Sequence, residues 1–158
     1  MMKLEEFKEF DKLKTKVLKY VLYKKRTEYE IRQKFSDIES NKLEDVIENL
    51  KEYGYINDGE YIERAISEFM ALKNLSLKEV KYKLYTKGID RNVLEDYFST
   101  NIEKLEKYEI KSAYNLFIKK NNSMEKQEII EYLLKKGYNI QNINEAIENI
   151  GDKIWITY

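Results

Sequence analysis

A pattern of apolar residues and glycine recurs along this chain with a period of 49 residues. The middle copy consists of Val80, Leu84, Gly88, Ile89 and Leu94, and the last copy of Ile129, Leu133, Gly137, Tyr138 and Ile143. One period earlier the pattern has two residues fewer, and the glycine is replaced by Asp37, a residue type that tolerates left-handed backbone better than most. A small helical unit cannot bury its apolar face alone, so copies of this kind are expected to stack.

Within each copy the apolar residues are spaced for helices. They recur at intervals of three and four, as in Leu43, Ile47 and Leu50, which is the period of a helix with one buried face. The chain also lacks proline and holds only five glycines, so few residues oppose helix formation. A strand-like alternation is confined to the last five residues, 154–158.

Local signals at helix ends divide each copy into three helices. Capping boxes are expected at 27–30 and 76–79, with a weaker version at 122–125. Simple N-caps are expected at Asp58, Asp90 and Asn139, and glycines that end helices at Gly54, Gly88, Gly137 and Gly151. A longer helix is expected before each capped one, over residues 11–24, 59–73 and 102–119.

These features predict an all-α fold of three tandem three-helix repeats, stacked into an elongated and curved array. We expect an N-terminal helix and the first repeat in residues 1–58, and the second repeat in residues 59–101. Residues 102–158 hold the third repeat and a C-terminal tail. The recurring apolar residues and glycines are explained as core and helix ends, so they specify the fold rather than a chemistry.

Composition excludes most kinds of catalytic and metal site. The chain has neither cysteine nor histidine, which excludes disulfides, thiolate and imidazole metal ligands, and cysteine or Ser-His-Asp catalysis. Neither of the common phosphate-binding glycine motifs is present. Asp58 and Glu60 are better explained as a helix start than as an acid–base pair. We therefore expect no enzymatic activity, no cofactor and no metal.

The start of the chain is charged and lacks the apolar core of a secretory signal. No run of apolar residues is long enough to cross a bilayer. The sequence therefore predicts a cytoplasmic protein with no membrane partner.

Charge is segregated although the totals of 29 basic and 29 acidic residues cancel. Residues 1–36 hold 11 basic and 6 acidic side chains, whereas residues 37–63 hold 2 and 9. The basic residues form two groups, one in the first repeat and one at the equivalent place in the second. The candidate binding face consists of both groups: Lys24, Lys25, Arg26, Arg32 and Lys34 in the first, and Lys78, Lys81, Lys83 and Lys87 in the second. Each group alone is explained as a solvated face. Stacking would join the two into a stripe that could follow a phosphate backbone or a mixed-charge protein surface.

The first two repeats resemble the RecX family, bacterial regulators of the RecA recombinase. The likeness lies in residues 16–22, 24–35 and 46–61, and continues with 75–80 and 87–89. Residues 53–61 are similar to the family's "LGYLDD..YA" segment, with Asn57 in place of the first aspartate. The resemblance covers residues 15 to 100 and extends more loosely into the third repeat. Family members are often distinctly basic, whereas this chain is neutral.

The resemblance implies a three-helix-repeat protein that lies in the groove of the RecA filament on single-stranded DNA. It further implies inhibition of recombination, ATP hydrolysis and coprotease activity without catalysis. Our leading hypothesis is therefore a monomeric, non-enzymatic filament regulator that reaches single-stranded DNA through the filament. Two alternatives stay open: a helical-repeat module that binds single-stranded nucleic acid directly, and a scaffold for another protein.

Overall fold

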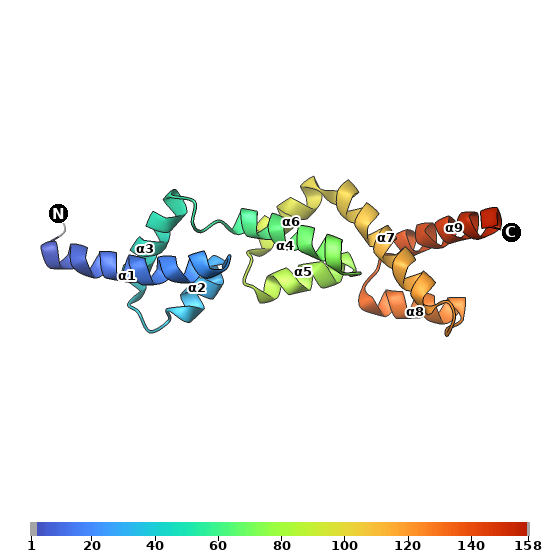
Figure 1. Cartoon of the computed structure of the whole chain (residues 1–158), viewed down its shortest axis with the longest axis horizontal. Coiled ribbons are helices and arrows are strands. Elements are labelled where there is room, and N and C mark those ends of the chain that lie inside the picture. The colour runs from blue at the N-terminus through green and yellow to red at the C-terminus, as the bar shows by residue number, and fades with distance from the viewer. Residues whose placement is uncertain (1–2, 158) are drawn as a thin grey trace. The chain divides into compact units, whose positions relative to one another are not determined.

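The computed structural model describes the backbone of residues 3–157 and the side chains of residues 3–151. This part of the chain is entirely helical between its loops and contains no strand (Figure 1). The helices are α1 (Leu4–Tyr23), α2 (Glu28–Lys34), α3 (Ser40–Glu52), α4 (Asp58–Leu72), α5 (Leu77–Thr86), α6 (Arg91–Thr100), α7 (Ile102–Lys120), α8 (Lys126–Lys136) and α9 (Ile140–Thr157). The prediction of an all-α fold is confirmed. The elongated, curved stacking stays a prediction.

The chain forms two compact units. The first comprises Met1–Glu63 with Thr86–Asp90, and the second comprises Arg64–Tyr85 with Arg91–Tyr158. In the first unit α1 packs against α3 (Figure 1). The core between them and α2 consists of Val17, Val21, Ile31, Leu43, Val46, Ile47, Leu50 and Ile56.

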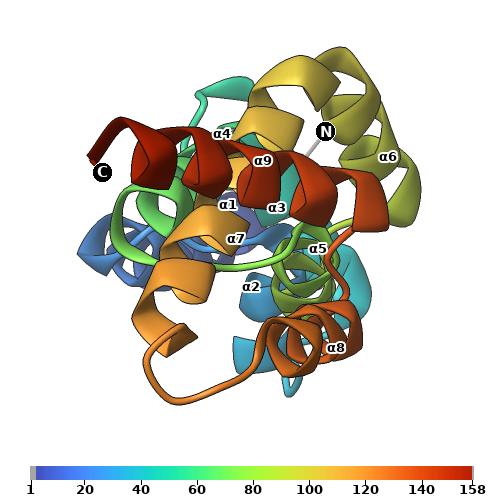
Figure 2. The ribbon, with the colours of Figure 1, turned by 90° about the vertical axis from the view of Figure 1, so that its right-hand side faces the viewer.

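In the second unit α7 packs against α9, and the two helices cross in Figure 2. The core there consists of Ala113, Leu116, Phe117, Ile129, Leu133, Tyr138, Ile143, Ala146 and Ile150. The apolar residues that recur at intervals of three and four in the sequence are thus the residues that form the two cores. The predicted boundaries between the three repeats, after residues 58 and 101, stay a prediction.

The two strong capping boxes are formed as predicted. The Thr27 hydroxyl accepts the Glu30 N–H at 3.1 Å, and the Glu30 carboxylate accepts the Thr27 N–H at 3.2 Å. Ser76 and Glu79 make the same reciprocal pair, with both distances at 3.0 Å. These bonds satisfy N–H groups that the first turn of a helix leaves without a partner.

The cap of α4 lies one residue earlier than predicted. Asn57 accepts the Glu60 N–H at 3.1 Å, whereas Asp58 is already the first helical residue. The Asp58 carboxylate instead accepts the N–H of Glu28 at 3.0 Å. Asp58 therefore caps α2 rather than its own helix.

Two further local predictions are wrong. Helix α8 follows Glu125, whose side chain makes no cap hydrogen bond, so no capping box forms at 122–125. Asp37 does not adopt left-handed backbone, since no residue other than glycine has a positive φ in the part of the chain that the structure describes. The first copy has two residues fewer than the others and closes its second helix without a left-handed residue.

Helix α9 does not end at Gly151 as expected but continues to Thr157, so no strand forms at 154–157. Tyr158 lies outside the described residues. Glycine costs about 1 kcal/mol relative to alanine inside a helix. The helix continues through Gly151 in spite of this cost.

A residue pair sixty positions apart holds the start of α2. The Thr27 hydroxyl donates a hydrogen bond of 2.6 Å to the carbonyl oxygen of Lys87. One residue later, the Glu28 N–H donates to Asp58. We call these contacts, which lie within the first unit, the first joint.

The second unit repeats this arrangement at the start of α5. The Ser76 hydroxyl donates to the carbonyl oxygen of Lys136 at 2.7 Å, and the Leu77 N–H donates to the carboxylate of Glu109 at 2.9 Å. We call these contacts the second joint. In both joints a cap hydroxyl meets the carbonyl before a glycine, and the next N–H meets a carboxylate.

The glycine of each joint is required by its surroundings. Gly88 has a φ of +78°, and a Cβ added there would overlap the Tyr29 side chain. Gly137 has a φ of +96°, and an added Cβ would lie 2.8 Å from the Cβ of Lys78. Only glycine combines this left-handed backbone with so close an approach.

Candidate functional site

The basic group around α1 and α2 is partly neutralised by neighbouring acids. Lys25 pairs with Glu60 at 3.1 Å. Arg32 bridges two carboxylates, Glu28 at 2.8 Å and Glu44 at 2.7 Å. These two predicted site residues therefore have protein partners that an external anion would have to replace.

Glu28 is the centre of this charge network. Burial alone would raise the pKa of its carboxyl, but hydrogen bonds from Arg32 and Lys51 outweigh burial and hold that pKa below its usual value. Contact with Glu28 in turn raises the pKa of both cations. Burial raises the pKa of the nearby Asp58, and the hydrogen bond from the Glu28 N–H offsets only part of this effect.

Three other cations of this group make no ion pair with a carboxylate in the described chain: Lys24, Arg26 and Lys34. The Arg26 guanidinium lies over the Tyr20 ring, 4.1 Å from its centroid. Lys34 lies 5.9 Å from the same centroid. Two positive charges therefore share one aromatic ring.

The second basic group lies on and after α5. Lys81 pairs with Glu95 at 3.2 Å and lies 4.8 Å from the Phe98 ring. Lys78 packs against Gly137 in the second joint, and Lys83 is half-buried. Beside them Tyr82 is 69% exposed.

The structure separates the predicted site residues between the two units. Lys87 belongs to the first unit, where its carbonyl accepts from Thr27 and its ammonium lies 4.0 Å from Glu30. Lys78, Lys81 and Lys83 belong to the second unit. A single stripe that joins all nine residues stays a prediction.

Three cations outside the nine predicted site residues lie over aromatic rings in the second unit, and one of them is Lys136, 5.4 Å from the Tyr132 ring. Lys73 is 5.7 Å from the Phe69 ring, and Lys120 is 4.2 Å from the Tyr132 ring. Each stands at the C-terminal end of a long helix, α4 or α7. In the sequence, Lys73 and Lys120 could have been noticed only as basic residues at the C-terminal ends of the two long helices.

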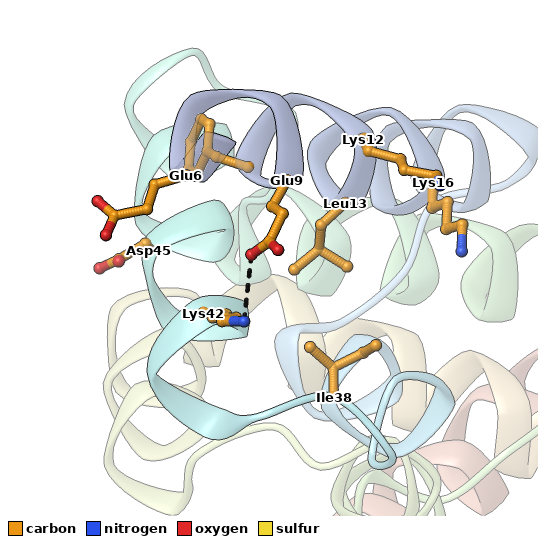
Figure 3. A pocket seen from close by; sticks show the side chains of 9 residues that line it. Glu6, Glu9, Lys12, Leu13, Lys16, Ile38, Lys42 and Asp45 are labelled. Carbon is orange, nitrogen blue, oxygen red and sulfur yellow. Dashed lines mark hydrogen bonds and ion pairs between the residues drawn. The ribbon is translucent and has the colours of Figure 1, made fainter. Parts of the chain in front are cut away.

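A pocket of about 460 Å³ lies between α1, the loop before α3 and α3 itself (Figure 3). Its apolar lining comes from Phe10, Leu13 and Ile38. The charged lining consists of Glu6, Glu9, Asp45, Lys12, Lys16 and Lys42. Glu9 pairs with Lys42 at 3.3 Å, as the dashed line in Figure 3 marks. None of the nine predicted site residues lines this pocket.

Across the residues that the structure describes, no helix has the length and apolar character needed to span a membrane. Within the same residues, no group of three or more acidic side chains is placed to hold a metal ion.

No protein-family model matches the chain. The chain is 31% identical over 153 residues to the regulatory protein RecX of Clostridium perfringens strain SM101, covering 90% of this chain and 70% of the relative. It is 27% identical to the regulatory protein RecX of Clostridium beijerinckii, with 93% and 72% covered.

Solved structures show the same fold. The crystal structure of RecX from Lactobacillus salivarius superposes with a TM-score of 0.77 and 24% identity, covering 90% of this chain and 96% of that one. A second crystal structure of a regulatory protein RecX gives a TM-score of 0.74 with 18% identity, covering 94% and 80%.

Proposed function

Because the chain belongs to the RecX family of regulatory proteins, we propose that it regulates the RecA recombinase by binding its filament on single-stranded DNA. Binding inhibits strand exchange, ATP hydrolysis and coprotease activity, and the protein catalyses no reaction itself. The single observation that carries this proposal is the 31% identity over 90% of the chain to a regulatory protein RecX. The protein acts in the cytoplasm, as a monomer.

The unpaired cations support a contact with a negatively charged partner. No carboxylate in the described chain pairs with Lys24, Arg26 or Lys34, so no internal ion pair has to be broken when an external anion approaches them. Lys25, Arg32 and Lys81 have carboxylate partners and therefore attract an external anion less strongly. The binding face is accordingly centred on the unpaired residues of the nine.

The direct test is the DNA-dependent ATPase rate of the cognate recombinase, titrated with this protein at fixed single-stranded DNA. We expect inhibition at protein concentrations comparable to or below that of the recombinase. An unchanged ATPase rate at saturating protein would refute the proposed function.

The binding face is tested by neutralising unpaired lysines rather than by reversing charges. Reversal at Arg32 or Lys81 would place a new acid beside Glu28 or Glu95, which would destabilise the fold as well. We propose the triple variant Lys24→Gln, Lys34→Gln and Lys78→Gln. The matched control is Lys12→Gln, Lys16→Gln and Lys126→Gln, which removes the same charge from lysines that also have no ion pair in the described chain.

We expect the first triple variant to inhibit the ATPase several-fold less strongly than the control. Equal inhibition by the two variants would show that these three residues do not form the binding face. Comparable circular dichroism spectra and melting temperatures establish that both variants are folded.

A second candidate function is direct binding of single-stranded nucleic acid without a protein partner. The observation that favours it is the exposed Tyr82 between Lys81 and Lys83, because an exposed ring among basic residues can stack on bases. This function predicts affinity for bare oligonucleotides that falls steeply with salt and is independent of recombinase.

A further inference from the structure

The first half of α1 carries an apolar row that the rest of the first unit does not cover. Leu4, Phe7, Phe10 and Leu13 follow one another at intervals of three, so their side chains are neighbours on the helix surface. Leu4 is 70% exposed and Phe7 is 49% exposed, whereas the other two are partly buried and line the pocket beside α3. No residue of α1 before Val17 is fully buried. Because an amphipathic helix normally buries its apolar stripe against another element, we expect this row to have a partner.

Charges of opposite sign flank the two ends of the row. Glu6 and Glu9 line the pocket near the start of α1, and Lys12 and Lys16 line it further along the helix (Figure 3). Within the described chain, Glu9 pairs with Lys42, and the other three residues make no ion pair. The face therefore has a negative end and a positive end, and most of its charge is available to a partner.

Such a face is complementary to itself when its direction is reversed. If two copies of α1 lie antiparallel, the acids of each copy face the lysines of the other, and the two apolar rows meet between them. A parallel pair would instead place acids against acids and lysines against lysines. In a two-fold symmetric contact both chains use the same surface, so every favourable contact is made twice. Opposite charges across an interface also fix the orientation of the partners.

We propose that the free protein forms a two-fold symmetric dimer in which the first halves of two α1 helices pack antiparallel. The Phe7 side chain of each copy is buried against the apolar row of the other. A second copy fits this face better than an anionic strand or surface does, because the face carries both signs of charge in two separate groups. The dimer is a state of the free protein, and it goes beyond the proposed function, in which a single chain binds the filament.

The experiment uses two charge-reversed variants of the full chain. Glu6→Lys with Glu9→Lys makes both ends of the row positive, and Lys12→Glu with Lys16→Glu makes both ends negative. All four residues are exposed, so both variants are expected to fold. Sedimentation velocity at increasing protein concentration measures the association of each protein, and circular dichroism establishes that the helix content is retained.

The matched control reverses two acids at the same spacing on another exposed helix face, Glu103→Lys with Glu106→Lys in α7. We expect the wild type and this control to shift from the mass of one chain to twice that mass as the concentration rises. Each charge-reversed α1 variant alone should stay monomeric, because charges of like sign then face one another. An equimolar mixture of the two α1 variants should regain association, because the positive face of one then meets the negative face of the other.

Three results would overturn the dimer. The first is a wild type that stays monomeric up to millimolar concentration. The second is a mixture of the two α1 variants that stays as monomeric as each variant alone. The third is association of each α1 variant by itself as strongly as the wild type, because the charges would then play no part in the contact.

A single substitution tests the apolar row independently of charge. Phe7 is half-exposed, so Phe7→Ala is expected to fold, and it removes apolar area that the dimer buries twice. We expect the dissociation constant of the dimer to rise by at least about tenfold. Phe7→Leu keeps an apolar side chain and should weaken the dimer less. An unchanged dissociation constant for Phe7→Ala would count against the proposed contact.

The recombinase ATPase assay distinguishes a second copy from the filament as the partner of this face. Phe7→Ala should inhibit the ATPase at least as strongly as the wild type does, because it leaves more of the protein monomeric. If Phe7→Ala inhibits less strongly and the wild type does not associate, the face contacts the filament and the dimer is refuted. If the wild type associates as expected but does not inhibit, the proposed function fails and the dimer stands.

Discussion

The hydroxyl of Thr27 donates a hydrogen bond of 2.6 Å to the carbonyl oxygen of Lys87, sixty residues further along the chain. The hydroxyl oxygen of Thr27 also accepts the N–H of Glu30. A hydroxyl offers one donor and can also accept, so this side chain both caps α2 and attaches it to a distant turn. Ser76 has the same two roles, with Glu79 and Lys136 as its partners.

Thr27→Ala is expected to lower the free energy of unfolding by about 2 kcal/mol, because it removes a helix cap and a buried hydrogen bond together. Thr27→Ser keeps the hydroxyl and is expected to retain most of that stability. Urea unfolding followed by circular dichroism measures both variants. The control is Ser123→Ala, since the Ser123 hydroxyl contacts only the carbonyl of Lys120 at an exposed turn. Equal losses at Thr27 and Ser123 would contradict the role of the first joint.

Substitution of glycine by alanine is expected to have three different outcomes. Gly88→Ala should prevent folding or cost at least about 3 kcal/mol, because the new Cβ overlaps Tyr29 and the backbone is left-handed. Gly54→Ala has the left-handed backbone, with φ +77°, but nothing within 4 Å of the Cβ, and should cost about 1 kcal/mol. Gly151→Ala lies inside α9 with open space and should stabilise by about 0.5–1 kcal/mol. Melting temperatures rank the three, and equal values for Gly88→Ala and Gly54→Ala would refute the close approach.

The stability contributed by Glu28 is expected to depend on pH. Its folded-state pKa lies below the unfolded value, so its contribution is fully present above the ordinary glutamate pKa and is lost as the pH falls through the folded-state value. Glu28→Gln should therefore lower the free energy of unfolding by about 0.5–1 kcal/mol at neutral pH, and by less in acid. Urea unfolding at several pH values measures the difference. Glu44→Gln is a control that removes a more exposed carboxylate from the same Arg32, and its effect should be smaller.

Asp58 is expected to show the opposite pH dependence. Burial raises its folded-state pKa, so the penalty for ionisation is complete above that pKa, shrinks as the pH falls below it, and is gone below the ordinary aspartate pKa. Asp58→Asn keeps an oxygen that can accept the Glu28 N–H. The variant should be at least as stable as the wild type at neutral pH, and its advantage should vanish in acid. A variant less stable than the wild type at neutral pH would show that the charged hydrogen bond outweighs the burial.

Glu109→Ala is expected to be strongly destabilising. This carboxylate is 2% exposed and accepts from the backbone N–H groups of Leu77 and Asn139 and from the side chain of Asn142. Removing it leaves three donors without their acceptor, which costs on the order of 3 kcal/mol or more. Glu106→Ala, at an exposed position of the same helix, should change stability by less than about 0.5 kcal/mol. Thermal unfolding of the two variants tests the difference.

Features that depend on neighbours in sequence could be predicted. The capping boxes at Thr27 and Ser76 are present because a hydroxyl and a glutamate three residues later are sufficient to form them. Gly88 and Gly137 are likewise left-handed as expected. The end of α9 is predicted wrongly, because glycine only disfavours a helix interior by about 1 kcal/mol and the helix continues through Gly151 to Thr157.

Features that depend on distant residues could not be predicted. The sequence suggests that Asp58 caps its own helix, whereas the fold brings its carboxylate to the N–H of Glu28, thirty residues away. Of the nine candidate cations, pattern alone could not show that Arg32 is neutralised by two acids while Arg26 lies over a ring. The interaction of each cation depends on tertiary contacts that charge counts do not contain.

The hydrogen bonds of the two joints have the same direction along the chain, from the hydroxyl of one copy to the turn of the next copy. The middle copy provides a receiving turn, Lys87–Gly88, and also a hydroxyl, Ser76, that reaches the copy after it. The first copy has Asp37 where such a turn needs glycine, and the last copy has Glu125 where the hydroxyl would stand. A duplicated middle copy, inserted after residue 124, would therefore find a matching hydroxyl before it and a matching turn after it. Neither outer copy could be duplicated beyond its own end with the same hydrogen bonds, so we expect an added copy to keep both kinds of bond only when it is inserted between the first and the last.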